Sequence, residues 1–127
     1  MFQAAGLRAE PNLTQSGAMA DEMRDRTGQT AVIFIAIRTP QDDVGYAQAA
    51  AAMDALAAQQ PGYRGIDSVR DAQGVGITIS WWDSDAAAVR WRDHPAHADI
   101  RAAGRAHWYD GYEVAVAQVQ RSYRWPA

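Results

Sequence analysis

The sequence contains no cysteine and no lysine, so its twelve basic residues are all arginines. The absence of cysteine excludes a disulfide framework, a thiolate metal site and a cysteine nucleophile. No apolar run approaches the roughly 18 residues that a membrane span needs. The net charge of −3 comes without a basic block, which argues against nucleic-acid binding. A length of 127 residues then fits one globular domain.

The first 30 residues show mixed charges and no lasting periodicity. They also lack the basic and apolar regions of a secretory signal, so we expect a cytoplasmic protein. We predict a flexible tail over residues 1–30 and a folded domain over residues 31–127. A short helix around Ala18–Asp25 is the less favoured alternative to disorder there.

The folded domain opens with an unbroken apolar run, Ala31–Ile37, which is typical of a strand covered on both faces. Helical spacing of apolar residues then predicts a helix over about Val44–Gln60, ended by Pro61 and Gly62. The remaining predicted elements are strands over Tyr63–Val69 and Gly76–Trp82, a helix over Asp85–His94 that Pro95 interrupts, a second helical piece over Ala96–Trp108, and a strand over Tyr112–Gln120.

Alternation within the strands predicts which side chains share a face of the sheet. Ile66 should lie on one face of its strand, with Tyr63 and Gly65 on the other. Trp81 and Trp82 should point to opposite faces. In the last strand we expect Tyr112, Val114 and Val116 on one face and Glu113, Ala115 and Ala117 on the other.

The element order is β-α-β-β-α-β, the ferredoxin-like arrangement of the α+β class. It predicts a four-stranded antiparallel sheet with both helices on one side. The continuous apolar first strand implies that the other side is also covered. A second copy of the chain is the simplest cover, so we predict a homodimer.

Several segments in this order resemble the antibiotic biosynthesis monooxygenase family of dimeric α/β-barrel proteins over about residues 31–124. The matching segments are Val32–Phe34 leading to Arg38 and Thr39, Gln60–Tyr63, Ser68–Asp71 into Gly76–Trp82, then Trp91, His94, His97, Gly104, Arg105, Trp108, Tyr109 and Tyr112. Members of this family include cofactor-free oxygenases of aromatic polyketides, haem-degrading monooxygenases and proteins with no known reaction.

The resemblance implies a monooxygenase that acts on a small aromatic or polyketide-like substrate in a cavity between sheet and helices. We expect no tightly bound metal and no cofactor, with haem as the alternative. The candidate catalytic residues are Arg38, His94, His97 and Arg105. The candidate substrate-binding residues are Trp81, Trp82, Trp91, Trp108 and Tyr112. Two alternatives remain: a non-catalytic or stress-related dimer that binds a small ligand, and a haem-degrading monooxygenase. The haem-degrading members use an Asn on the first strand, and this chain has none between residues 31 and 127.

Each candidate residue also has a purely structural interpretation. The tryptophans could form core, since each aromatic ring buries a large area. The His94-Pro-Ala-His97 segment could cap the broken helix, because a zinc site needs three or four ligands and none follows nearby. Arg105 could pair with Asp83, Asp110 or Glu113 and, if the helix persists, share a face with Tyr109. Arg38 could bind an anionic ligand or pair across the dimer.

Overall fold

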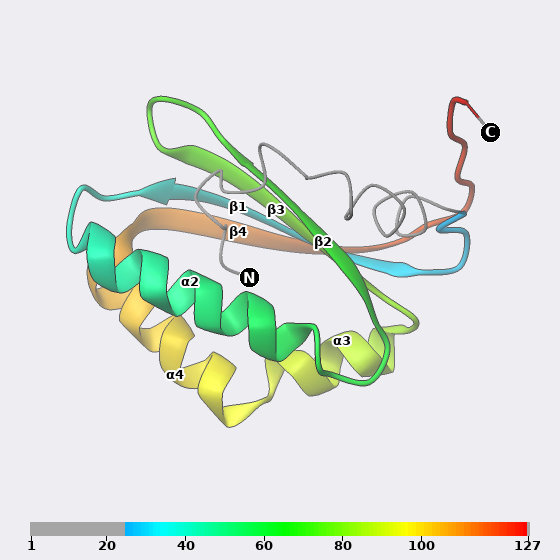
Figure 1. Cartoon of the computed structure of the whole chain (residues 1–127), viewed down its shortest axis with the longest axis horizontal. Coiled ribbons are helices and arrows are strands. Elements are labelled where there is room, and N and C mark those ends of the chain that lie inside the picture. The colour runs from blue at the N-terminus through cyan, green and yellow to red at the C-terminus, as the bar shows by residue number, and fades with distance from the viewer. Residues whose placement is uncertain (1–24, 127) are drawn as a thin grey trace.

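The computed structural model describes residues 25–126 as one layer of sheet packed against one layer of helices (Figure 1). The predicted tail, and the alternative helix around Ala18–Asp25, lie almost entirely outside these residues. The strands are β1 (Thr30–Arg38), β2 (Tyr63–Arg70), β3 (Val75–Trp82) and β4 (Tyr109–Gln118). The helices are α2 (Asp43–Ala57), α3 (Asp85–Arg92) and α4 (Pro95–Ala103), and a π-helical turn, η1 (Gly104–Trp108), extends α4. This order confirms the predicted α+β, ferredoxin-like fold.

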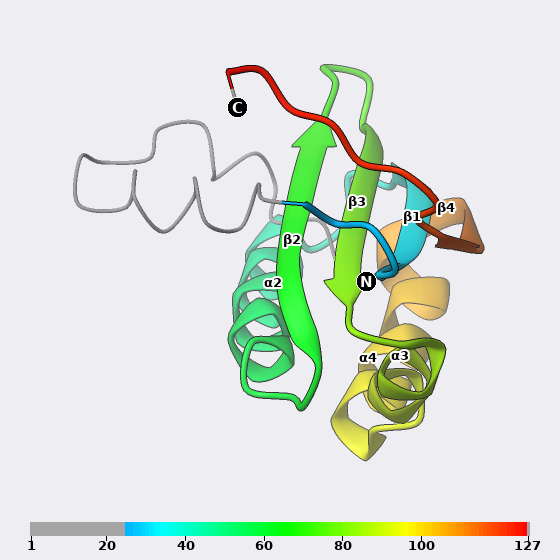
Figure 2. The ribbon, with the colours of Figure 1, turned by 90° about the vertical axis from the view of Figure 1, so that its right-hand side faces the viewer.

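The sheet is antiparallel throughout, with strand order β2-β3-β1-β4. All helices lie on one side of it, as Figure 1 shows, and Figure 2 gives the view turned by 90°. We call this side the inner face and the opposite side the outer face. Strand β1 pairs with both β3 and β4, so its main chain is satisfied on both edges. On the inner face it buries Val32, Phe34 and Ala36.

Strand β2 corrects one prediction. Tyr63 pairs with Trp82, whereas Gly65 pairs with Trp81, so the register shifts between Tyr63 and Gly65. The extra residue is a β-bulge, which turns the following residues to the other face. Tyr63 therefore lies on the inner face, where its ring meets Trp82 edge-on at 5.7 Å between centroids. The simple alternation placed it wrongly with Gly65.

The helical spacing predicts one apolar stripe on α2, Tyr46, Ala49, Ala50, Met53, Leu56 and Ala57; of these, Tyr46, Ala50, Met53 and Ala57 are buried, and Ala49 and Leu56 are partly buried. Its N-cap, Asp42, adopts a left-handed conformation and accepts a hydrogen bond from the Gly45 amide at 3.1 Å. After α2 the chain turns at Gly62, whose φ is +85°. A Cβ there would lie 2.6 Å from the Cβ of Ala87, so only glycine lets α3 approach this turn.

The second helical region is broken where predicted. His94 is the N-cap of α4, Pro95 occupies its first turn, and the Nδ1 atom of His94 accepts a hydrogen bond from the Ala96 amide at 3.1 Å. The helical region ends at Trp108, and β4 begins at Tyr109 rather than at the predicted Tyr112. The cause is pairing with a distant strand, since Arg38 of β1 is in register with Tyr109 beyond a shift in the ladder.

The core lies between the inner face and the helices. Trp82 is fully buried in this core, and its ring stacks on that of Trp91 of α3 at 6.4 Å between ring centroids. Trp81, its neighbour in sequence, lies on the outer face, where its Nε1 donates to the Oδ2 atom of Asp67 at 2.9 Å. The predicted opposite orientation of the two tryptophans is confirmed. No helix of residues 25–126 is both long and apolar enough to cross a bilayer.

Replacement of Trp82 by alanine should lower the free energy of unfolding by about 3–5 kcal/mol, because it leaves a cavity beneath two packed rings. Trp125→Ala is the matched control, since that side chain is 94% exposed and should cost close to nothing. Urea unfolding followed by far-UV circular dichroism measures both. Equal losses in the two variants would contradict the assignment of Trp82 to the core.

Candidate functional site

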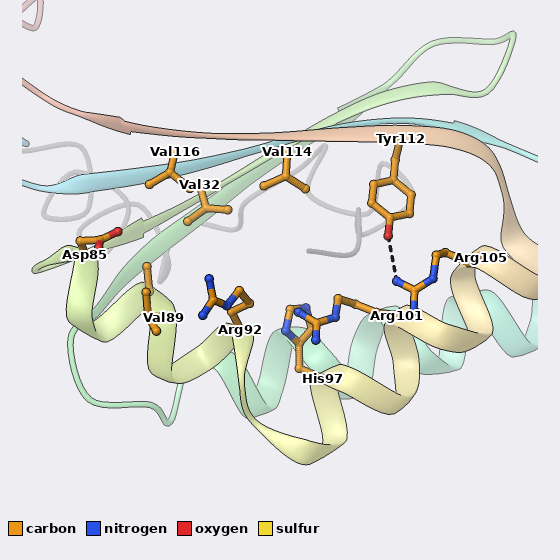
Figure 3. A pocket seen from close by; sticks show the side chains of 11 residues that line it. Val32, Asp85, Val89, Arg92, His97, Arg101, Arg105, Tyr112, Val114 and Val116 are labelled. Carbon is orange, nitrogen blue, oxygen red and sulfur yellow. Dashed lines mark hydrogen bonds between the residues drawn. The ribbon is translucent and has the colours of Figure 1, made fainter.

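A cavity of about 450 Å³ lies between the inner face at β1 and β4 and the helical layer of α3, α4 and η1 (Figure 3). The wall on the sheet side is mostly apolar. The wall on the helical side is mostly polar, apart from Ala88 and Val89 of α3. The lining residues are Val32, Asp85, Ala88, Val89, Arg92, His97, Arg101, Arg105, Tyr112, Val114 and Val116.

Three residues of the helical wall are spaced four apart: His97, Arg101 and Arg105. Residues at this spacing lie on one side of a helix, so one stripe carries all three side chains to the cavity. The π-helical turn begins at Gly104, and Arg105 is its second residue. The facing stripe comes from β4, whose alternation presents Tyr112, Val114 and Val116 as predicted.

His97 is the most deeply buried polar group of the cavity, at 1% exposure. Its imidazole stacks on the Trp91 ring at 4.8 Å with an interplanar angle of 11°. Neither Nδ1 nor Nε2 has a hydrogen-bond partner. A buried polar group without a partner is uncommon and is costly in the free protein. The sequence suggested that both His94 and His97 cap the broken helix. His94 alone has this role, and His97 does not.

Burial lowers the pKa of His97 to about 4, and the nearby charge of Arg101 acts in the same direction. The carbonyl groups of Trp91 and Arg92 favour the proton. Their effect is smaller than that of burial, so the pKa stays low. His97 is therefore neutral at pH 7, with a lone pair available on one ring nitrogen.

The charged groups of the cavity are three arginines and one acid, Asp85. Arg92 forms an exposed ion pair with its neighbour Asp93, with an Nε–Oδ1 distance of 2.9 Å. Arg105 donates from Nη1 to the hydroxyl of Tyr112 at 3.1 Å, which is a neutral partner. Arg101 makes no ion pair within 4.0 Å and no hydrogen bond with any of residues 25–126, although its charge is near enough to lower the pKa of the exposed Asp93. The side that carries Arg101 and Arg105 is thus positively charged.

Arg105 does not form the ion pair considered from the sequence. Asp83 instead pairs with Arg64, at 2.6 Å between Nε and Oδ1. Asp110 and Glu113 form no ion pair with Arg105 either, among the residues that the structure describes. The shared face with Tyr109 is also wrong, because the helical region ends at Trp108 and Tyr109 belongs to β4.

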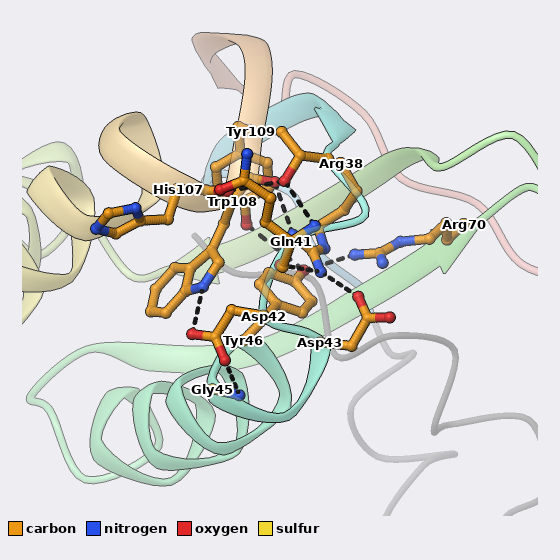
Figure 4. Close-up of polar contacts among 11 residues, drawn as sticks. Arg38, Gln41, Asp42, Asp43, Gly45, Tyr46, Arg70, His107, Trp108 and Tyr109 are labelled. Carbon is orange, nitrogen blue, oxygen red and sulfur yellow. Dashed lines mark hydrogen bonds and ion pairs between the residues drawn. The ribbon is translucent and has the colours of Figure 1, made fainter.

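Arg38 lies in a separate cluster at the end of β1 (Figure 4). Its Nη1 donates to the Trp108 carbonyl at 2.7 Å, and its Nη2 pairs with Asp43 at 2.6 Å. The guanidinium also lies 4.0 Å from the centre of the Tyr46 ring. These contacts tie β1, α2 and η1 together within one chain. Arg38 does not line the cavity.

The tryptophans and His94 also lie outside the cavity lining. Trp82 and Trp91 stack behind it, and Trp91 supports the His97 ring. Trp108 packs edge-on against Tyr46 and donates from Nε1 to Asp42 at 3.3 Å. Of the nine residues proposed from the sequence, His97, Arg105 and Tyr112 line the cavity.

Sequence reasoning overlooked Arg101 and Arg92, which line the same cavity. For Arg101 the signal was present, since it lies midway between two candidates at helical spacing. Arg92 carried no comparable signal.

The cavity lining does not contain a set of metal ligands. Residues 25–126 contain no group of three or more His, Asp or Glu side chains that could hold a metal ion. His97 and Tyr112 are the two lining residues of a type that serves as an axial ligand to haem iron.

The sequence profile of the antibiotic biosynthesis monooxygenase family matches residues 28–103. The chain belongs to this family. It is 47% identical over 91 residues to YqjZ, an uncharacterised protein of Bacillus subtilis, covering 72% of this chain and 79% of that one. Membership of this family shows that the chain is a protein of the monooxygenase type. It does not identify a substrate.

Solved structures share the fold at lower identity. SnoaB, a cofactor-independent oxygenase from Streptomyces nogalater, aligns with a TM-score of 0.65 at 16% identity over 80% of this chain and all of that one. Rv0793 from Mycobacterium tuberculosis aligns with a TM-score of 0.62 at 21% identity over 70% of this chain and 92% of that one.

The state of His97 predicts an acid-dependent loss of stability. Its pKa rises from about 4 in the folded chain to its ordinary 6.5 on unfolding, so the unfolded chain binds more protons between these values. Stability should therefore fall as the pH drops from about 6.5 to about 4, by on the order of 3 kcal/mol from this group. Urea unfolding at several pH values measures the slope.

The variant His97→Phe retains a ring against Trp91 and cannot titrate, so this part of the slope should disappear. His107→Gln, at an exposed position, is the control and should keep it. Identical slopes in the wild type and in His97→Phe would show that His97 is not held neutral by burial.

Proposed function

We propose that this protein is a monooxygenase that oxidises a small aromatic substrate inside the cavity, without a bound metal or organic cofactor. The observation that carries the proposal is the neutral, unpartnered imidazole of His97 on a cavity wall that also holds Arg105 and Tyr112. A base and a cation beside an apolar wall are what the removal of a proton from carbon requires. The likeness to a cofactor-independent oxygenase supports the same chemistry.

In the proposed reaction, His97 takes a proton from an activated CH₂ group of the substrate, as in an anthrone. The Arg105 guanidinium and the Tyr112 hydroxyl stabilise the negative charge on the enolate oxygen. That negative charge also offsets Arg101, which raises the pKa of His97 as the proton arrives. The ordinary weakness of a base with a low pKa is thereby reduced in the complex.

The carbanion then reduces dioxygen directly. The CH₂ carbon loses two hydrogens, gains one oxygen atom as a carbonyl and is oxidised by four electrons. Dioxygen accepts these four electrons, and its second oxygen atom leaves as water. The valine side chains on the strands provide an apolar surface for the aromatic body of the substrate.

Oxygen uptake with a panel of anthrones tests the activity. His97→Phe should lower kcat by about 10²–10⁴-fold, the range for loss of a general base. Arg90→Gln, at an exposed position on α3, should retain the rate. Loss of turnover in His94→Asn but not in His97→Phe would move the base to His94 and contradict the proposal.

The same preparation distinguishes the alternatives. Binding of anthrones without oxygen uptake would indicate a non-catalytic ligand-binding protein. A Soret absorbance shift on haem titration, lost in His97→Phe, would indicate a haem protein.

We further propose that the protein forms a homodimer through the outer face of the sheet. That face carries exposed apolar side chains in neighbouring strands, among them Ile37, Val69, Val75 and Ile77, which are 38–65% exposed in the single chain. An apolar patch of this kind is typical of an interface between subunits. A second copy placed there would cover the face that the helices leave open (Figure 2).

Sedimentation equilibrium should give about twice the 13.9 kDa of one chain at micromolar concentration. Ile77→Asp, at a central position of the outer face, should shift the population toward the monomer, because a dimer would bury the new charge. Gln48→Asp on the exposed side of α2 is the charge-matched control and should stay dimeric. A monomeric wild type would contradict the proposed interface.

A further inference from the structure

The charges of the cavity do not balance, and this imbalance bears on what the cavity binds. Asp85 and Val89 lie at one end, and Arg101, Arg105 and Tyr112 lie at the other (Figure 3). Arg92 is paired with Asp93, and His97 carries no charge at neutral pH. Two guanidinium groups therefore face the same end of the cavity with no carboxylate among residues 25–126 paired to either.

The two guanidinium groups differ in what they contact. Arg105 is engaged with the Tyr112 hydroxyl at 3.1 Å, in the position that the proposed reaction assigns to the developing oxyanion. Arg101 is half-buried and lies one helical turn before it, next in the stripe after His97. It has no hydrogen bond to any of residues 25–126. A partly desolvated guanidinium that faces a cavity without an acceptor is suited to an anion supplied by a ligand.

We propose that the substrate is an aromatic acid, an inference that rests on the proposed function. The Arg101 guanidinium binds its carboxylate, and its ring system lies against the strand valines Val32, Val114 and Val116. A planar carboxylate matches the planar fork of arginine with two parallel hydrogen bonds. The apolar part of the lining, Val32, Val114 and Val116 on the sheet and Val89 on the facing helix α3, suits the flat ring system.

This placement separates two roles along one helical stripe. Arg101 binds a charge that the substrate carries throughout, so it contributes to affinity. Arg105 meets a charge that appears only during the reaction, so it contributes to rate. Neutralisation of Arg101 by the carboxylate also removes one of the causes that keep His97 unprotonated. The acid group of the substrate would thus favour the base that acts on it.

The test compares two fluorescent ligands of matched shape, anthracene-9-carboxylate and anthracene-9-carboxamide, by titration with the full chain at pH 7. The wild type should bind the carboxylate at least tenfold more tightly than the amide, since only the acid gains a charge-assisted pair. Arg101→Gln should reduce this preference to about twofold or less. Arg101→Lys should retain part of it, because the charge stays and the bidentate fork is lost.

Arg90→Gln is the matched control, since it removes the same charge from an exposed position and should keep the full preference. Equal affinity of the wild type for acid and amide overturns the proposal without reference to any variant. A preference that survives in folded Arg101→Gln overturns the assignment to Arg101.

Oxygen uptake separates this inference from the proposed activity. Tight binding of the carboxylate with no oxidation of any anthrone would refute the activity and leave the acid site standing. Oxidation of uncharged anthrones as efficiently as of anthrone carboxylates, with kcat/KM unaffected by Arg101→Gln, would keep the activity and refute the acid site.

Discussion

A stack of aromatic rings joins the sheet to the helices, and the position of the cavity depends on it. Trp82 of β3 lies against Trp91 of α3, and Trp91 in turn lies against the His97 ring of α4. Tyr63 meets the other side of Trp82 because the bulge in β2 turns it inward. These rings hold α3 and α4 against the centre of the sheet. The remaining space under β4, at the edge of the sheet, is the cavity.

The same stack explains how a histidine can be both buried and unpartnered. Burial of a polar ring without a hydrogen bond costs stability, and aromatic stacking over its full face offsets part of that cost. The result is an imidazole that stays neutral at physiological pH with its nitrogens open to a ligand. Arginine charges nearby reinforce this state. A strained or unsatisfied group at a cavity wall is a frequent property of functional sites.

Much of the fold could be read from local patterns. The apolar run of β1, the stripe of α2, the proline break and the alternation of β4 all depend on neighbours within one element. The errors arose where distant segments meet. The side on which Tyr63 lies depends on a bulge in its pairing with β3, and the start of β4 depends on its register with β1. The ion pair considered for Arg105 does not form among the described residues, and Asp83, one of its candidate partners, is paired with Arg64 of β2.

The candidate site divides in the same way. The sequence by itself determined the order of elements and the four-residue spacing that carries His97, Arg101 and Arg105 to one side of a helix, because helical geometry is local. It also determined that Tyr112, Val114 and Val116 share a face. Only the tertiary structure decided that these two stripes oppose each other across a cavity, and that Arg38 and four tryptophans belong to the framework instead. These arrangements depend on the separation between the sheet and the helices, which the packed rings set. The rings come from elements that are distant in the chain, so the sequence pattern of one element does not reveal that separation.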